Sequence, residues 1–214
     1  MVSTADRVDV ILKRHGTTYA QEAGIKVADK PSPLYQLLVL STLLSARISS
    51  DIGVAAAKEL FKSGYRTPQR MHDATWQQRV DALGRGHYRR YDESTATMLG
   101  KGAELVQDHY SGDLHKVHEQ AETAKDISQA LQDFPGIGPA GADIFIREVQ
   151  GIWTDFSPSI DKKIKDGAKS LGLPTSPEKF AALVPRSDLP KLSAACVRAS
   201  LDKSVAADVN DALG

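Results

Sequence analysis

The fold of this chain is decided by residues 131–147, which read LQDFPGIGPAGADIFIR. Apolar residues recur at helical spacing before and after the segment 134–136. That segment, Phe-Pro-Gly, ends the first helix, because proline cannot continue a helix and glycine adopts backbone conformations that are closed to other residues. Pro139 suits the first position of the second helix, where its missing amide hydrogen costs nothing. The stretch therefore predicts a helix, a tight hairpin and a second helix over residues 126–150.

The hairpin is the first candidate binding site. Two glycines flank Ile137, so side chains are removed from a turn that ends at a helix N-terminus. Backbone N–H groups there face outward where the helix dipole is positive, and such a position binds phosphate. We therefore predict a phosphate-binding hairpin made by Gly136, Ile137, Gly138 and Ala140. The alternative is that the glycine-rich turn only joins two helices.

The rest of the chain is typical of an all-α protein. Of its 214 residues, 41% are hydrophobic, which is enough for a sizeable core in one large domain or two small ones. Ser32 and Pro33 are expected to begin a helix whose leucines leave almost no polar face, so that helix should be central and buried. No run alternates between polar and apolar residues as strands do. Residues 17–30 should form a connection, and residues 189–213 a single helix. Further caps are expected at Ser3 or Thr4, Thr67, Thr75 and Ser176.

Composition gives no global indication of a charged partner. The 27 Lys and Arg residues balance 27 Asp and Glu residues, which speaks weakly against a strongly electrostatic binder. Residues 62–101 carry eight basic against four acidic residues, whereas residues 103–138 carry two against seven. A basic stripe is therefore one interpretation, and solvated helix faces are the other.

Signals for metals and for membranes are missing from the sequence. Cys196 is the only cysteine, so the chain can form no internal disulfide, cysteine zinc site or four-cysteine iron–sulfur cluster. The histidines lack the spacing of metal ligands, so no metal is expected. The N-terminus lacks a signal-peptide pattern, and the longest apolar run, residues 34–44, is too short to span a bilayer. We expect a cytoplasmic protein, nucleoid-associated in a prokaryote, that does not contact membranes.

Segment 134–138, FPGIG, resembles the LPGVG hairpin of the helix-hairpin-helix DNA glycosylases, in the endonuclease III branch. Segment 157–161, SPSID, follows one helix and a loop later, where that family places its catalytic aspartate at the head of the next helix. Segment 43–47, LLSAR, is similar to the family's LLSAQ segment, and residues 83–91 fall where the family has its LGLYNSKA loop. In order and separation, residues 30–172 match the family.

The resemblance implies two helical lobes with DNA at the cleft between them. Residues 33–136 would form a six-helix barrel, and residues 1–32 and 137–214 would pair as a discontinuous helical domain. Many relatives end in a four-cysteine iron–sulfur loop, which this C-terminus lacks, so a branch without the cluster is implied. No cofactor is expected, although backbone carbonyls of the hairpin can hold a monovalent cation that meets the phosphate. The expected state is a monomer that acts on double-stranded DNA.

Asp161 is the candidate catalytic residue. Excision of a base breaks an N-glycosidic bond through an oxocarbenium-like sugar, which calls for a fixed negative charge and a held water. A carboxylate supplies both, and the N-terminal amides of the following helix would favour its charged form. The alternative is that Asp161 only caps that helix.

A second departure from the family concerns the type of reaction. Members that also cut the strand carry a lysine two residues beyond the second hairpin glycine, and its amine forms a Schiff base with the sugar. Ala140 occupies that position, which predicts either a monofunctional glycosylase that uses Asp161 and water, or a protein that no longer cuts. Lys162 and Lys163 lie beside Asp161 and could substitute, which would give a bifunctional glycosylase and lyase. Their more ordinary role is phosphate contact or a solvated face.

Further candidates for contact with DNA lie in two segments. Arg47 occupies the family's glutamine position, and the basic aromatic loop GRGHYRRY falls at the family's wedge position. His87 or Tyr88 could stack on a base, and Arg85, Arg89 or Arg90 could pair with phosphates. Two other classes stay open. One is a non-catalytic DNA-binding module, and the other is an all-α protein unrelated to nucleic acid whose hairpin only packs helices.

Overall fold

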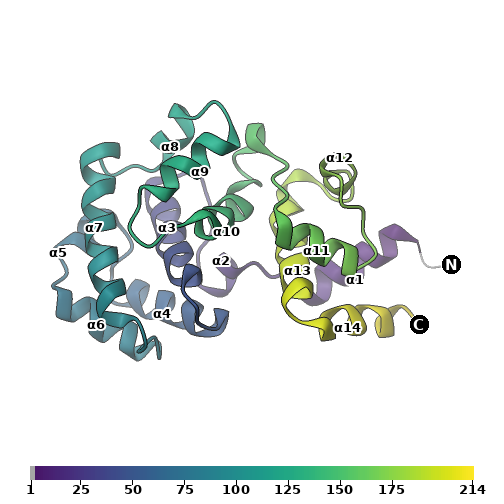
Figure 1. The fold of residues 1–214 in the computed structure, drawn as a ribbon, viewed down its shortest axis with the longest axis horizontal. Coiled ribbons are helices and arrows are strands. Elements are labelled where there is room, and N and C mark those ends of the chain that lie inside the picture. The colour runs from purple at the N-terminus through teal and green to yellow at the C-terminus, as the bar shows by residue number, and fades with distance from the viewer. Residues whose placement is uncertain (1–2) are drawn as a thin grey trace. The chain divides into compact units, whose positions relative to one another are not determined.

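The computed structural model describes residues 3–214, and that part of the chain contains helices and no strand (Figure 1). This confirms the all-α fold class that the sequence predicts. Two short 3₁₀ helices, η1 (Thr154–Phe156) and η2 (Arg186–Asp188), lie between α-helices. The α-helices are α1 (Thr4–His15), α2 (Tyr19–Glu22), α3 (Pro31–Ser45), α4 (Ser50–Lys62), α5 (Pro68–Asp73), α6 (Trp76–Arg85), α7 (Asp92–Tyr110), α8 (His115–Gln120), α9 (Ala124–Gln132), α10 (Pro139–Val149), α11 (Lys162–Ser170), α12 (Pro177–Ala181), α13 (Leu189–Leu201) and α14 (Lys203–Leu213).

The chain divides into two compact units. One comprises residues 1–19 and 147–214, of which residues 1 and 2 lie outside the described part, and we call it the discontinuous unit. The other comprises residues 20–146, and we call it the continuous unit. Helix α10 begins in the continuous unit and ends in the discontinuous one.

The bounds of these units differ from the division expected at residues 33 and 136. Residues 20–32 and 137–146 belong to the continuous unit. The first segment is held there by Asp29, whose carboxylate bonds Nδ1 of His115 in α8 at 2.8 Å. The second is held by the close approach of Gly141 to α3, where an added Cβ would lie 2.3 Å from a serine hydroxyl oxygen. That the continuous unit forms a six-helix barrel stays a prediction.

Helix α3 is the apolar, buried helix that the sequence predicts. Nine of its fifteen residues are buried, so it keeps no extended polar face. The helix begins at Pro31 with Lys30 as N-cap, and the expected start at Ser32 was wrong. Proline at the first position presets the helical φ without a capping side chain. The hydroxyl of Ser32 instead donates to the carbonyl of Arg66 at 2.9 Å.

The other predicted caps are confirmed, and two predicted boundaries were wrong. Residues 17–30 contain the short helix α2, and the helix expected over 189–213 is broken at Asp202. The carboxylate of Asp202 accepts a hydrogen bond from the Ser204 amide at 2.8 Å, so this residue ends α13 and caps α14. The confirmed N-caps are Ser3, Thr67 and Thr75, each with a side-chain hydrogen bond, and Ser176 without one.

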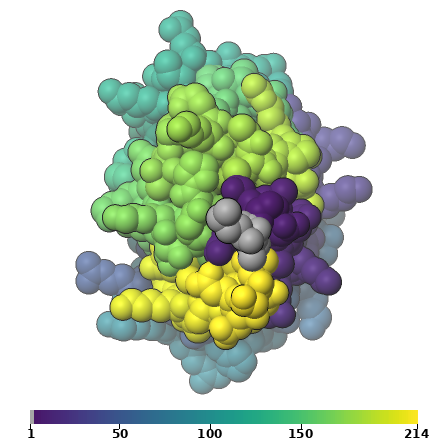
Figure 2. Space-filling model, turned by 90° about the vertical axis from the view of Figure 1, so that its right-hand side faces the viewer, coloured from purple at the N-terminus to yellow at the C-terminus, as the bar shows by residue number. Residues whose placement is uncertain are grey.

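Helix α13 lies at the core of the discontinuous unit. Helix α11 packs directly against it, because a Cβ added at Gly167 would lie 1.7 Å from the carbonyl oxygen of Cys196. Helices α1 and α14 also pack together, as the purple and yellow segments of Figure 2 show. Asp208 of α14 joins them by ion pairs to Arg14 and, at 2.9 Å, to His15. Helix α11, which begins just after Asp161, is therefore packed firmly against α13.

Candidate functional site

The hairpin between α9 and α10 has the tight turn that the sequence predicts. Gly136 has a φ of +86°, a left-handed conformation that favours glycine. A Cβ at this position would also lie 2.8 Å from Sδ of Met98, so a side chain there would require Met98 to move. Phe134 and Ile137 are buried, and the amide of Ile137 donates to the carbonyl of Phe134 at 3.0 Å. The apolar residues therefore anchor the hairpin, and Ile137 uses its amide within the turn.

The exposed tip of the hairpin is formed by the start of α10. Gly138 and Ala140 are exposed, and a Cβ added at Gly138 would meet nothing within 4 Å. Because α10 begins at Pro139, the amides of its first turn have no partner within the helix. The helix dipole is positive at this end. Gly138 and Ala140 thus remain the better candidates for an anion contact, while Ile137 serves the turn.

A cavity of 310 Å³ lies in the continuous unit beside the hairpin. Its wall includes Arg47, Tyr88, Tyr91, Met98 and Gly136. Apart from Met98, which belongs to α7, these residues come from all three segments of this unit that resemble the glycosylase family, although the segments are far apart in sequence. Tyrosine rings and a methionine give the wall apolar surface, and hydroxyl groups and a guanidinium give it polar groups. Mainly apolar walls with a few polar groups are common in small-molecule pockets.

Two neighbouring residues in the loop after α6, for which the sequence predicts the same role, differ in their exposure to solvent. His87 is exposed and has a φ of +63°, which is uncommon for a residue other than glycine. Tyr88 has an exposed fraction of 0%, and Oγ1 of Thr95 lies 3.5 Å from its hydroxyl oxygen. Burial rules out Tyr88 as a wedge that enters a duplex from the surface, so it can meet a base only from the cavity wall. His87 is the member of the pair that reaches solvent.

The predicted arginines differ in the same way. The guanidinium of Arg85 bonds the carboxylate of Glu59 at 3.2 Å and the hydroxyl of Ser63 at 2.7 Å, so it is turned toward α4. Arg47 and Arg89 are exposed, the first on the cavity wall and the second beside a separate shallow hollow. Arg47 therefore combines exposure with a place on the cavity, whereas Arg85 already has an anionic partner.

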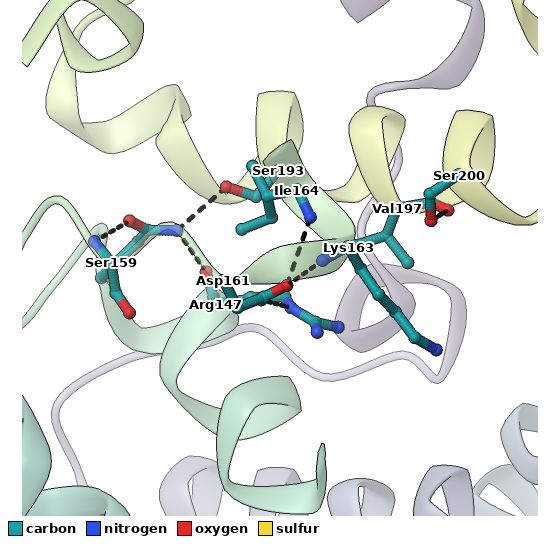
Figure 3. A network of polar contacts seen from close by, with 9 residues as sticks. Arg147, Ser159, Asp161, Lys163, Ile164, Ser193, Val197 and Ser200 are labelled. Carbon is teal, nitrogen blue, oxygen red and sulfur yellow. Dashed lines mark hydrogen bonds and ion pairs between the residues drawn. The ribbon is translucent and has the colours of Figure 1, made fainter. Parts of the chain in front are cut away.

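Asp161 lies in the discontinuous unit at the N-cap of α11. Its Oδ1 accepts hydrogen bonds from the amides of Lys163 at 2.7 Å and Ile164 at 3.2 Å. Its Oδ2 accepts a hydrogen bond from Nε of Arg147 (Figure 3). The exposed fractions of the two side chains are 13% for Asp161 and 12% for Arg147, so solvent screens this ion pair weakly. Three donors therefore fix the carboxylate in one orientation.

Two residues of this site were missed by reasoning from sequence. Arg147 lies in the last turn of α10, and Gln150 follows that helix. The amide of Gln150 accepts from the backbone N–H of Ser159 at 3.2 Å and donates to Oγ of Ser193 at 3.0 Å. No local pattern reveals such partners. The one available signal was a glutamine placed directly after the apolar residues that mark the buried face of α10.

Lys162 and Lys163 have separate environments although they are adjacent. The Lys162 amine bonds the carboxylate of Asp166 at 2.7 Å, and its side chain has an exposed fraction of 88%. This hydrogen bond raises the pKa of Lys162, which keeps the amine protonated. The backbone amide of Lys163 donates a hydrogen bond to Asp161, and the side chain of Lys163 is exposed. Neither residue has the buried environment of a nucleophilic lysine.

Other types of site find little support in residues 3–214. Within that part of the chain, no group of three or more His, Cys, Asp or Glu side chains could hold a metal ion. Burial raises the pKa of the Cys196 thiol to about 12, so it is not a thiolate nucleophile at neutral pH. Among the described helices, none is long and apolar enough to cross a bilayer.

Comparison with known proteins bears on the fold. No family model and no curated protein matches the sequence. Among solved structures, the chain is similar to a non-covalent Endonuclease III–DNA complex, with a TM-score of 0.51 and 15% identity over 93% of this chain and 86% of that chain. A trapped Endonuclease III–DNA covalent intermediate, an estranged-adenine complex, gives a TM-score of 0.48 at 16% identity over the same shares. From the first comparison we conclude that this chain has the helix-hairpin-helix fold of endonuclease III, as its sequence predicts.

Proposed function

We propose that this protein is a DNA glycosylase that hydrolyses the N-glycosidic bond of a flipped damaged or mismatched base, with Asp161 as the catalytic carboxylate. The observation that carries the proposal is the state of Asp161: within the endonuclease III fold, it caps α11 and is held by three donors in a shielded position. A fixed negative charge of this kind stabilises a sugar that becomes positive in the transition state.

The proposed reaction breaks the bond between the sugar C1′ and the base nitrogen, whose electron pair leaves with the base. A water oxygen bonds C1′, one water proton passes to Asp161 and then to the departing base, and an abasic site remains. A carboxylate oxygen can accept about two hydrogen bonds. Oδ1 of Asp161 already has two, whereas Oδ2 has the one from Arg147 and can accept a second from water. The reaction is a hydrolysis and needs no cofactor.

The proposed enzyme is monofunctional. A lyase requires a neutral amine that attacks C1′ and forms a Schiff base. Ala140 stands at the hairpin position of the family's lysine, and the Lys162 amine is held protonated by Asp166. The remaining candidate, Lys163, is exposed. Water is therefore the proposed nucleophile.

Double-stranded DNA is the proposed partner. The solved structure that carries the comparison is an endonuclease III in complex with DNA. In this chain, the exposed first turn of α10 offers amides to a phosphate, and Arg47 offers a cation at the cavity wall. His87 is the proposed residue of the loop to enter the duplex, because it is exposed whereas Tyr88 is buried.

A second candidate function is a non-catalytic DNA-binding protein of the same fold. It is favoured by the same contacts of Asp161, since an N-cap aspartate paired with an arginine also describes a purely structural residue. In that case the hairpin would still bind phosphate, and the charge of Asp161 would serve stability alone.

A comparison of wild type with Asp161→Asn tests the proposal. Asparagine caps helices as well as aspartate does, so the variant removes the charge and preserves the cap. Duplexes that each carry one damaged or mismatched base are incubated with both proteins and analysed with and without hot alkali. The proposal predicts breaks after alkali alone, and their loss in the variant. Absence of breaks on every duplex, with equal DNA binding by both proteins, would establish the second candidate.

A further inference from the structure

We propose that Gln150 is a positioning residue for Asp161. Its side-chain amide fixes both the loop that leads into Asp161 and the end of the helix that carries Arg147. The inference rests on the proposed function, because positioning of the carboxylate matters for a reaction only if Asp161 acts on a substrate. Gln150 acts here through its neighbours and is not a catalytic residue.

The contacts of Gln150 join three parts of the discontinuous unit. Its exposed fraction is 2%, so its polar atoms depend on protein partners. Its Oε1 accepts a hydrogen bond from the backbone N–H of Ser159 at 3.2 Å. Its Nε2 donates to the carbonyl of Arg147 at 3.2 Å and to Oγ of Ser193, in α13, at 3.0 Å. Figure 3 shows two of these partners, Ser159 and Ser193, near the pair of Arg147 and Asp161.

The loop that leads into Asp161 makes this contact important. Pro158 has no amide hydrogen, and the Ser157 amide bonds the nearby Thr154 carbonyl at 3.4 Å. The Ser159 amide, two positions before Asp161, donates to a side chain outside the loop. Without an acceptor there, the last residues before the carboxylate would keep the packing of Ile160 on the core and the helix cap, but would lose this backbone hydrogen bond.

The side-chain amide of Gln150 also holds Arg147, the residue that bonds Oδ2 of Asp161. The guanidinium of Arg147 bonds Oδ2 of Asp161, and the backbone carbonyl of Arg147 is held by Gln150. A single planar amide thus sets the distance between the backbone of Arg147 and the backbone of the loop. Only a side chain with both a donor and an acceptor can make these bonds, which among uncharged residues of this length means glutamine.

A purely structural role would have a different signature. If Gln150 only satisfied buried backbone groups, its loss would lower stability and leave the folded enzyme's rate unchanged. If it positions Asp161, the rate of the chemical step should fall while DNA affinity stays the same, because the hairpin is untouched. Small displacements of a reacting group lower rates by about 100-fold.

The experiment compares Gln150→Met, which keeps the volume and removes the amide, with wild type. Ser193→Ala is a milder variant that removes one partner of Gln150 and keeps both backbone bonds. Gln132→Met, at an exposed site in α9, is the matched control. Single-turnover excision, the Kd for a duplex with an uncleavable abasic analogue, and hydrogen–deuterium exchange of residues 157–164 are measured well below each unfolding temperature.

The expected result for Gln150→Met is a single-turnover rate lowered by about 10- to 100-fold, an unchanged Kd within about twofold, and faster exchange of residues 157–164. Ser193→Ala should show the same changes in smaller degree, and the control none. Unchanged exchange, or an unchanged rate in the presence of faster exchange, would overturn the inference. Wild type that excises no base would defeat the proposed function instead, and the exchange data would still decide whether Gln150 orders the loop.

Discussion

Nε of Arg147, in the last turn of α10, donates a hydrogen bond to Oδ2 of Asp161, the N-cap of α11. The pair links the second helix of the helix-hairpin-helix to the helix that begins at the candidate catalytic residue. Both side chains are largely shielded from solvent, so each charge is compensated mainly by the other. Removal of either partner leaves a shielded charge without its counterion.

Arg147→Met should therefore lower the free energy of unfolding by about 3 kcal/mol, because the carboxylate of Asp161 loses its counterion while it remains shielded. Urea denaturation measures the change. The double variant with Asp161→Asn should regain part of the loss, since asparagine needs no countercharge. Arg186→Met is the control at an exposed arginine. A loss no larger than that of the control would show that the pair contributes little.

Gly167→Ala should destabilise the protein by about 3 kcal/mol, because the new methyl group would overlap the carbonyl of Cys196 and push α11 away from α13. Gly84→Ala is the matched control, since a Cβ there meets nothing within 4 Å in a helix. The control should be more stable than wild type by about 0.5 kcal/mol. Thermal and urea unfolding compare the two, and equal stability would contradict the close packing of α11 on α13.

Arg79 is a buried arginine of the continuous unit, and its loss should be costly. Its guanidinium donates to the carbonyls of Ala96 at 2.9 Å, Met71 at 3.0 Å and Ala74 at 2.6 Å. Arg79→Met would leave these acceptors without their donor, so we expect the free energy of unfolding to fall by about 3 kcal/mol. Arg70→Met, at an exposed position of α5, should change it by less than about 0.5 kcal/mol. Similar urea midpoints for the two variants would contradict this reading of Arg79.

The contact of His115 with Asp29 should make stability depend on pH. The hydrogen bond to Asp29 raises the pKa of His115 above its ordinary value of 6.5. A raised pKa in the folded state means that the contribution is fully present below pH 6.5 and is lost as the pH rises through the folded value. The stability difference between wild type and His115→Gln should therefore shrink from pH 5.5 to pH 9. In the background of Asp29→Asn this pH dependence should become smaller, because Glu119 and Asp113 still favour the charged imidazole, and an undiminished dependence there would contradict the assignment.

Borohydride trapping should detect no covalent complex between wild type and a duplex with an abasic site. A Schiff base needs a neutral amine, and Asp166 raises the pKa of Lys162. Asp166→Asn removes that effect and serves as a sensitised variant, with Lys163→Ala to identify the other amine. A trapped complex with wild type that is lost in Lys163→Ala would make the enzyme bifunctional.

The sequence by itself determined the features that depend on neighbouring residues. The hairpin at Phe134 to Gly138 follows from proline and glycine chemistry, and the caps at Ser3, Thr67 and Thr75 follow from side chains that bond amides two or three residues later. The failures have local causes too. Pro31 starts α3 before Ser32 because proline needs no cap, and Asp202 ends one helix by capping the next.

Only the tertiary structure decided the partners of the candidate site. Asp161 could be placed at a helix start from its sequence context, but its ion pair with Arg147 spans 14 residues, and the bond from Gln150 to Ser193 spans 43. Sequence likewise treated His87 and Tyr88 as equals, and burial separated them. Capping and turn formation depend on residues a few positions apart, so they can be predicted from the sequence. Burial and pairing depend on which helices pack together, and that is set by the whole fold.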